Sequence, residues 1–217
     1  IIFGWSAKCG CSHLKNIYWY LQTGKEKNII HTHRDRNKLP NDINNYTTIV
    51  IIRNPIKRLI SGFLDKYKIN GELRNNYKGD NLTFTNFVNK LINGKWNEIC
   101  YHHFAPQTRE HFTEKILDSK KIIFYDICNI DYKYIEKIYN KKIPDSVLNK
   151  KQGHERKIKK ETINENVFDL NIDDYVNFNV ELKYFFNEDL KKKIENFFID
   201  DFNFFKKVGF DYLNTTF

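Results

Sequence analysis

The segment TTIVII, residues 47–52, constrains the fold more than any other part of this 217-residue sequence. It is rich in β-branched residues and has no polar side chain after its two threonines, the pattern of a strand buried on both faces. Such strands occur in parallel sheets whose faces are covered by helices. The segment therefore predicts an α/β fold with a mainly parallel sheet.

The rest of the chain alternates strand-like and helix-like segments, as an α/β fold requires. Short apolar runs predict further strands, at residues 1–6, 28–33 and 120–127. Apolar residues at helical spacing predict helices, at residues 12–24, 55–67, 83–92 and 130–140 and in one last long helix through 190–205. No internal repeat or linker divides the sequence, so we expect a single domain over residues 1–217.

The composition is that of a folded, basic protein. Hydrophobic residues make up 41% of the sequence, which excludes a disordered chain. The formal net charge of +9 favours an anionic partner, such as a nucleic acid, an acidic polymer, a phosphorylated cofactor or a membrane surface. The alternative is a lysine-rich solvated surface, and the mixed Lys and Glu of the C-terminal part fit this better than a dedicated nucleic-acid face.

The sequence shows neither a signal peptide nor an apolar run near the roughly 20 residues of a membrane span. It also contains no methionine, so we expect either that the chain is trimmed or that some residues are missing from it. We expect a cytoplasmic location for the chain as it stands, and the Golgi lumen if an N-terminal anchor precedes it.

The cysteine spacing does not suggest a metal site. Cys9 and Cys11 are separated by one residue, which is poor spacing for zinc, and Cys100 and Cys128 lie far away in the sequence. Free thiols in a reducing compartment are the simplest interpretation. A disulfide between distant cysteines stays open for a secretory protein.

The loop SAKCGCSH, residues 6–13, joins the first predicted strand to the first predicted helix. Gly10 allows a tight turn, and the small side chains of Cys11 and Ser12 keep the backbone accessible. The free N–H groups of the helix N-terminus would face a bound anion, and Lys8 adds a positive charge. Since ligands of open parallel sheets bind beyond the carboxyl ends of the strands, the loop predicts an anion site. A plain turn with a surface lysine is the alternative.

The order of residues in this loop separates it from the common nucleotide-binding loop. In the pattern G-x-x-x-x-G-K-[ST] the glycine precedes the lysine, whereas here Lys8 precedes Gly10. The loop therefore disfavours an ordinary ATPase or kinase.

A second candidate anion site follows the buried strand at 47–52. Arg53 leaves the strand end, and an arginine there can grip a phosphate through two parallel hydrogen bonds. Asn54 is a good N-cap and Pro55 suits the first helical position. Ser61 lies two turns into the helix and off its apolar stripe. An arginine paired with a surface carboxylate is the alternative.

Read together, the two segments resemble the nucleotide-binding motifs of the sulfotransferases, P-K-x-G-x-[ST] and R-[DN]-P-x-x-R-L-x-S. The second pattern is matched in this sequence at Arg53, Asn54, Pro55, Arg58, Leu59 and Ser61. Ala7 replaces the proline of the first pattern. Weaker likeness is found in KKIIFYDI, HHFAPQ and FFIDDFNFFKKVGF. The sequence is most similar to the Golgi-type carbohydrate and uronyl sulfotransferases, which use 3′-phosphoadenylyl sulfate (PAPS).

The resemblance implies a P-loop-NTPase-like three-layer fold with a central, mainly parallel sheet flanked by helices. It implies in-line transfer of a sulfuryl group from PAPS to a carbohydrate hydroxyl, without a metal. Lys8 would stabilise charge on the leaving oxygen, and Arg53 and Ser61 would hold the 3′-phosphate. The loop that binds the 5′-phosphate would consist of Lys8, Cys9, Gly10, Cys11, Ser12 and His13.

Histidines are the candidates for the general base, because their pKa lies near neutrality. His31 and His33 are two residues apart, on one face of the strand predicted at 28–33. In the uronyl 2-O-sulfotransferases an H-x-H stretch at this place supplies the base, so the resemblance implies His33 as the base and His31 as its helper. His102 and His103 are the rivals and candidate substrate contacts, and His13 is a third candidate. Hydrogen-bonded structural histidines are the alternative.

A basic, glycine-containing segment, GHERKIKK, occupies residues 153–160. The resemblance implies a late phosphate-contacting loop, in which Arg156 and Lys157 are the candidate ligands. A solvated run of charges is the alternative.

Two other function classes stay open beside the PAPS-dependent sulfotransferase. A nucleic-acid- or polyanion-binding module on the same fold would be expected to lose the charged site residues, yet Lys8, Arg53 and Ser61 are present. A nucleotide phosphotransferase would need the loop order that this sequence lacks. We therefore expect a carbohydrate acceptor as partner, for which the net charge suits an anionic sugar, and no nucleic acid.

Overall fold

The structure is a computed structural model, which describes all residues except 27–40, 78–80, 111–113, 118, 151–157 and 215–217. It forms two compact units, each made of two stretches of chain. The first unit comprises residues 1–53 and 111–155, and the second comprises residues 54–110 and 156–217.

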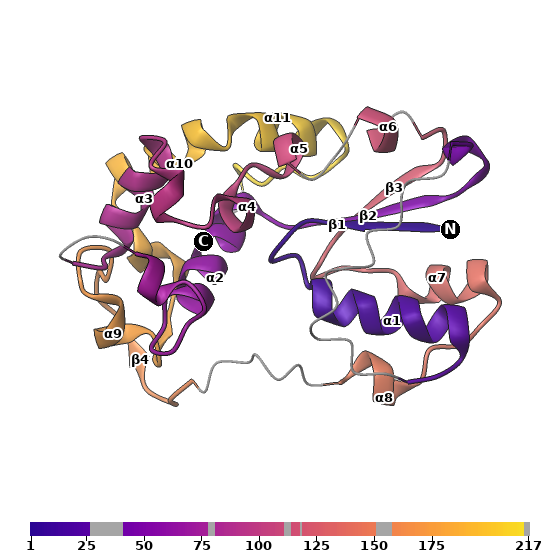
Figure 1. The fold of residues 1–217 in the computed structure, drawn as a ribbon, viewed down its shortest axis with the longest axis horizontal. Helices are drawn as coiled ribbons and strands as arrows, with labels where there is room; N and C mark the ends of the chain where they lie inside the picture. The colour runs from indigo at the N-terminus through magenta and orange to yellow at the C-terminus, as the bar shows by residue number, and fades with distance from the viewer. Residues whose placement is uncertain (27–40, 78–80, 111–113, 118, 151–157, 215–217) are drawn as a thin grey trace. The chain divides into compact units, whose positions relative to one another are not determined.

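The first unit is built around a parallel sheet. Among the described residues this sheet has three strands in the order β1-β2-β3: β1 is Ile2–Trp5, β2 is Thr48–Ile52 and β3 is Ile122–Asp126 (Figure 1). All five residues of β2 are buried, as the TTIVII segment predicts. The α/β class with a parallel sheet is confirmed. The strand predicted at 28–33 lies outside the described residues.

Helices pack against this sheet through one continuous apolar core. The helices and turns of the first unit are α1 (Cys11–Thr23), η1 (Ile43–Asn45), α6 (Glu114–Leu117), α7 (Tyr132–Tyr139) and α8 (Asp145–Leu148). The core joins α1, α7 and α8 to β2 through buried residues: Leu14, Ile17, Leu21, Ile49, Ile51, Ile135 and Val147. Gly24 ends α1 in the left-handed conformation, at φ 70°, as its sequence position predicts.

The second unit is mostly helical. Its helices are α2 (Pro55–Lys66), α3 (Phe84–Ile92), α4 (Tyr101–Phe104), α5 (Gln107–Glu110), α9 (Ile172–Tyr175), α10 (Glu188–Phe197) and α11 (Ile199–Lys207). Short turns and a two-stranded sheet complete it: η2 (Arg74–Asn76), η3 (Trp96–Glu98), η4 (Leu182–Phe185), β4 (Thr162–Ile163) and β5 (Asn179–Val180).

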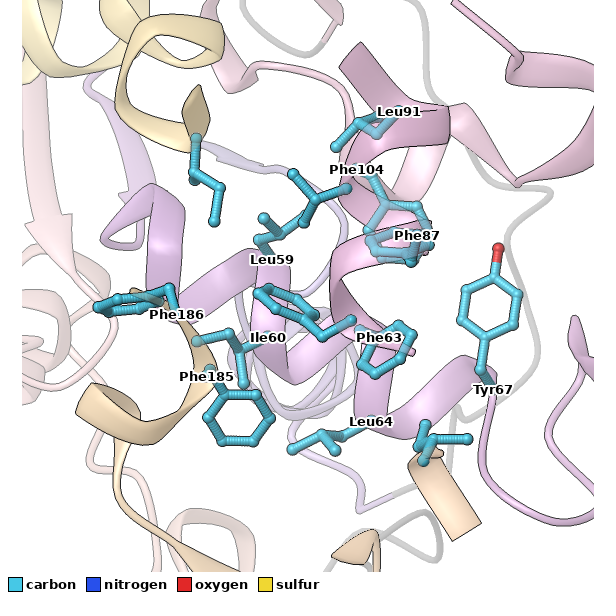
Figure 2. Packing of buried hydrophobic residues seen from close by; sticks show 14 of the residues in the cluster. Leu59, Ile60, Phe63, Leu64, Tyr67, Phe87, Leu91, Phe104, Phe185 and Phe186 are labelled. Atoms are coloured by element: carbon cyan, nitrogen blue, oxygen red, sulfur yellow. The ribbon is translucent and has the colours of Figure 1, made fainter. Parts of the chain in front are cut away.

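Helix α2 forms the centre of the second unit. Asn54 caps it, because the Asn54 side chain accepts hydrogen bonds from the backbone N–H groups of Ile56 and Lys57 at 2.9 and 3.1 Å. Figure 2 shows its apolar stripe packed among aromatic rings. The ring centroids of Phe63 and Phe87 are 5.0 Å apart, and those of Phe87 and Phe104 are 4.7 Å apart.

The last long helix predicted from the sequence is two helices in the structure. Helix α10 ends at Phe197 and α11 begins at Ile199, with Phe198 between them at φ −100° and ψ 18°. Phe198 is itself buried in the core. The apolar spacing continues through the break because Ile194 of α10 and Phe202 of α11 are buried in the same core as Phe198, so the periodicity could not reveal the break.

Candidate functional site

The carboxyl ends of the three parallel strands bring three connecting segments to one edge of the sheet. In the strand register, Trp5 lies opposite Ile51, and Ile52 lies opposite Asp126. The residues that follow these ends are the loop from Ser6, Arg53, and the turn after Asp126. This is the edge where ligands bind in open parallel sheets.

The loop after β1 has a strained backbone that fits an anion site. Lys8 and Gly10 both have positive φ, at 68° and 70°. The backbone N–H of Cys9 donates to the carbonyl oxygen of Ser6 at 3.2 Å, and the Ser6 hydroxyl lies 2.9 Å from the Cys9 sulfur. A left-handed conformation is unfavourable for lysine, and such strain is concentrated at ligand-binding sites. Turns of this kind create concave surfaces lined by backbone N–H groups.

Gly10 is required at its position for two reasons. Its φ of 70° is the left-handed region that disfavours a side chain, and a Cβ there would lie 2.3 Å from Cδ1 of Ile127. Gly10 is also the N-cap of α1, which begins at Cys11 with no side-chain cap. The first N–H groups of this 13-residue helix are therefore donors for an anion beyond the loop.

Arg53 ties the two sequence motifs together. Its Nη1 donates to the backbone carbonyl oxygen of Lys8 at 2.9 Å. Burial lowers the pKa of Arg53, while the nearby Cys9, Cys128 and Asp126 raise it. The guanidinium stays charged at neutral pH, because arginine is effectively always protonated in proteins. The edge of the sheet thus holds a fixed positive charge against the loop.

The remaining loop residues, Cys11, Ser12 and His13, are half-buried in the first turn of α1. His13 is held by a residue that the sequence analysis missed: its Nε2 lies 3.0 Å from the Tyr132 hydroxyl, at the start of α7. Burial lowers the pKa of His13, so its imidazole is neutral at neutral pH. No short motif marks Tyr132, because it is 119 residues from His13 in the sequence.

Three other predicted site residues belong to the second unit. Ser61 is half-buried on α2, between the buried Ile60 and Gly62. His102 is exposed and His103 half-buried, both on α4, with their ring centroids 5.7 Å apart. The structure thus brings Lys8 and Arg53 of the first unit into direct contact. Ser61 and the histidine pair belong to the second unit.

The second arginine of the R-[DN]-P-x-x-R-L-x-S pattern is an internal structural residue. Arg58 is fully buried, and its Nη1 donates to the carbonyl oxygen of Ala105 at 2.6 Å. The buried Asp201 carboxylate accepts hydrogen bonds from the backbone N–H groups of Gln107 and Thr108, both at 2.8 Å, and from the Thr108 hydroxyl at 2.7 Å. Three segments with sequence likeness to the sulfotransferases therefore meet in the second unit, at the segment 104–108.

Four predicted site residues lie outside the described residues. They are the candidate bases His31 and His33, and the candidate late phosphate ligands Arg156 and Lys157. Their roles stay predictions.

Within the described ranges, no group of three or more His, Cys, Asp or Glu side chains could hold a metal ion. No disulfide joins the four cysteines, all of which belong to the described part of the chain. None of the helices found in that part is long and apolar enough to cross a membrane.

The comparison with protein families decides between the function classes. The chain matches the sulfotransferase family over residues 1–208. It belongs to the sulfotransferase family. The match runs from the first strand to the end of α11, so it includes the loop at Lys8, the segment at Arg53 and the buried Asp201. Searches of curated proteins and of solved structures gave no significant match.

Membership of the sulfotransferase family places the parallel sheet in a P-loop-like α/β fold and makes the chain a transferase. The loop with the reversed order of lysine and glycine lies within the residues that match the family. Neither the binding module nor the phosphotransferase gains support from this family assignment.

Proposed function

We propose that this sulfotransferase moves a sulfuryl group from PAPS to a carbohydrate hydroxyl. The observation that supports this most is the hydrogen bond from Arg53 to the backbone of Lys8, which joins the two candidate phosphate sites at one sheet edge. PAPS carries phosphate groups at both the 5′ and 3′ positions of its nucleoside, so a single PAPS molecule would occupy both candidate phosphate sites. The family match over both units also supports one sulfotransferase domain across residues 1–217.

The 5′-phosphosulfate is proposed to lie on the loop and on the N-terminus of α1. Backbone N–H groups from Cys9 to His13 are the donors, and the Ser12 hydroxyl is a further donor. Arg53 and Ser61 are proposed to hold the 3′-phosphate, as their motif indicates. Arg156 and Lys157 are proposed as additional phosphate ligands.

Sulfuryl transfer moves a nearly neutral SO₃ group between two oxygen atoms in line. As the bond to the nucleotide breaks, negative charge develops on the phosphate oxygen that leaves. Positioning and charge stabilisation should dominate such a reaction, as in phosphoryl transfer. Lys8 is proposed to stabilise that oxygen, and this chemistry requires no metal.

The acceptor hydroxyl must lose a proton as it attacks sulfur. His33 is proposed as the general base, with His31 assisting, and His102 and His103 as acceptor contacts. His13 is a poorer candidate for the base, because its Nε2 already lies within hydrogen-bonding distance of Tyr132.

Replacing His33 with alanine is expected to lower the rate of PAPS-dependent sulfation by about 100-fold or more, the usual contribution of a general base. Affinity for 3′,5′-ADP should stay near wild type, since the proposed role of His33 is to take the proton of the acceptor and not to bind the nucleotide phosphates. Release of 3′,5′-ADP from PAPS in the presence of a mixed glycan acceptor measures the rate. His103→Ala is the matched comparison. If His33→Ala keeps turnover and His103→Ala loses it, His103 is the base, and if the wild type never turns over PAPS, the proposed function is wrong.

A further inference from the structure

The second unit has a polar hollow that the proposed nucleotide site does not use. Its volume is about 200 Å³, and it lies along α3 and the turn that follows. The residues that line the hollow include Tyr77, Asn86, Asn89, Lys90, Asn93 and Lys95. Among the described residues, the lining is rich in amides and has no carboxylate, and this chemistry indicates the class of ligand.

The lining depends on the amphipathic character of α3. Positions 86, 89, 90 and 93 recur at helical spacing, so their side chains share one face. The opposite face packs into the core through buried residues: Phe84, Phe87, Val88 and Leu91. Because the core fixes the apolar face, the amide-bearing face has a fixed orientation toward the hollow.

Several polar groups in the hollow have unused hydrogen-bonding capacity. In the part of the chain that the structure describes, the side chains of Asn89, Asn93 and Lys95 make no hydrogen bond or ion pair. The Asn86 amide nitrogen donates to the Asn81 carbonyl at 3.0 Å, which leaves its Oδ1 as an acceptor. An amide both donates and accepts, as a sugar hydroxyl does.

The charged side chains that the structure describes in the lining, Lys90 and Lys95, are both positive. Lys90 is fixed by an ion pair with Glu98, and its Nζ lies 4.5 Å from the centroid of the Tyr77 ring. Lys95 is exposed at the other end of the lining. Burial and the charge of Glu98 raise the pKa of Tyr77 to about 12, so its phenol stays neutral. The hollow therefore offers amide groups and one available ammonium.

We propose that this hollow binds a segment of an anionic oligosaccharide, with the amides of Asn89 and Asn93 on sugar hydroxyls and the ammonium of Lys95 on a carboxylate or sulfate. The inference rests on the proposed function, because it names the chemical class of the acceptor. It adds a binding subsite in the second unit, made of other residues than those proposed for the nucleotide.

A sugar fits this lining better than a nucleic acid does. Single-stranded nucleic acids are bound by grooves of cations with exposed aromatic rings on which bases stack. Of the lining residues that the structure describes, Tyr77 is the one aromatic side chain; it is half-buried with the Lys90 ammonium over its ring, and amides outnumber cations.

The test is a calorimetric titration of the full chain with hexasaccharides cut from heparin and from chondroitin sulfate. Neutral maltohexaose and a twelve-residue oligothymidylate serve as comparison ligands. Lys95→Glu is expected to weaken binding of an anionic hexasaccharide about tenfold, the effect of losing one charge-assisted hydrogen bond. Asn89→Asp is expected to weaken it about as much, because the carboxylate cannot donate to a sugar hydroxyl and repels the anionic ligand. Lys192→Glu, an exposed charge reversal on α10 outside the hollow, should change it less than twofold.

The inference would be overturned if neither anionic hexasaccharide binds at about 1 mM, or if Lys95→Glu and Lys192→Glu change the affinity equally. It would also be overturned if maltohexaose or oligothymidylate binds more tightly than the anionic hexasaccharides. Titration of 3′,5′-ADP into the same samples separates the two proposals. Nucleotide binding without hexasaccharide binding contradicts the proposal that the hollow binds a sugar, but it leaves the PAPS-dependent function standing. Hexasaccharide binding that is lost in Lys95→Glu, without nucleotide binding, supports the hollow as a sugar site and contradicts the PAPS-dependent function.

Discussion

Replacing Lys8 with alanine is expected to slow sulfuryl transfer by about 10²–10³-fold, the usual cost of removing one group that stabilises charge in the transition state. The fold should be unaffected. Lysine and alanine both carry a Cβ, so the strain of the left-handed backbone at φ 68° is the same in both proteins. The rate difference therefore reports the ammonium group.

Single-turnover release of 3′,5′-ADP from PAPS measures this effect, and calorimetry measures nucleotide affinity in parallel. The affinity should fall much less than the rate, because the backbone donors and Arg53 remain. Lys25→Ala, at an exposed position after α1, is the matched control and should react like the wild type. An unchanged rate in Lys8→Ala, or a fall equal to that in Lys25→Ala, would refute the role given to Lys8.

Replacing Asp201 with alanine is expected to lower the free energy of unfolding by about 3–5 kcal/mol, the usual cost of removing one partner from a buried charged cluster. Three donors would lose their acceptor: the N–H groups of Gln107 and Thr108 and the Thr108 hydroxyl. The buried guanidinium of Arg58 would also lose a nearby negative charge. The pKa of Asp201 is raised, because burial outweighs the opposing effect of these hydrogen bonds and of the charge of Arg58.

The neighbouring Asp200 provides a matched control for this prediction. Its carboxylate forms an ion pair with Arg109 at 2.6 Å, with side chains 51% and 57% exposed. Exposed pairs of this kind contribute about 0–1 kcal/mol, so Asp200→Ala should have little effect on stability. Urea unfolding followed by circular dichroism measures both variants. Equal midpoints for Asp200→Ala and Asp201→Ala would show that the buried cluster does not stabilise the unit.

Local patterns predict much of the fold because the core is regular. The β-branched run at 47–52 gives β2, and Asn54 followed by Pro55 gives the start of α2. The break at Phe198 could not be predicted, because the buried residues Ile194, Phe198 and Phe202 keep a four-residue spacing across it. Periodicity reports which side of a helix is buried, but it does not report where the axis changes direction.

The candidate site is only partly visible in the sequence. Lys8 and Gly10 could be identified because strand, turn and helix follow one another there. Their contact with Arg53 depends on the strand order, which places β1 beside β2. The sequence pattern also treats Arg53 and Arg58 alike, whereas Arg53 lies at the sheet edge and Arg58 is fully buried. Burial separates a ligand candidate from a structural residue, and burial depends on tertiary packing.

Calorimetric titration of 3′,5′-ADP into the wild type and Arg53→Ala tests the central claim most directly, which is that the loop at Lys8 and Arg53 form the site of a PAPS-dependent sulfotransferase. We predict binding by the wild type and a loss of about 10–100-fold in Arg53→Ala, the effect of one charge-assisted contact to phosphate. Arg109→Ala, an exposed arginine of the second unit, should bind like the wild type. No binding by the wild type at about 1 mM ligand, or equal affinities in the wild type and Arg53→Ala, would contradict the account.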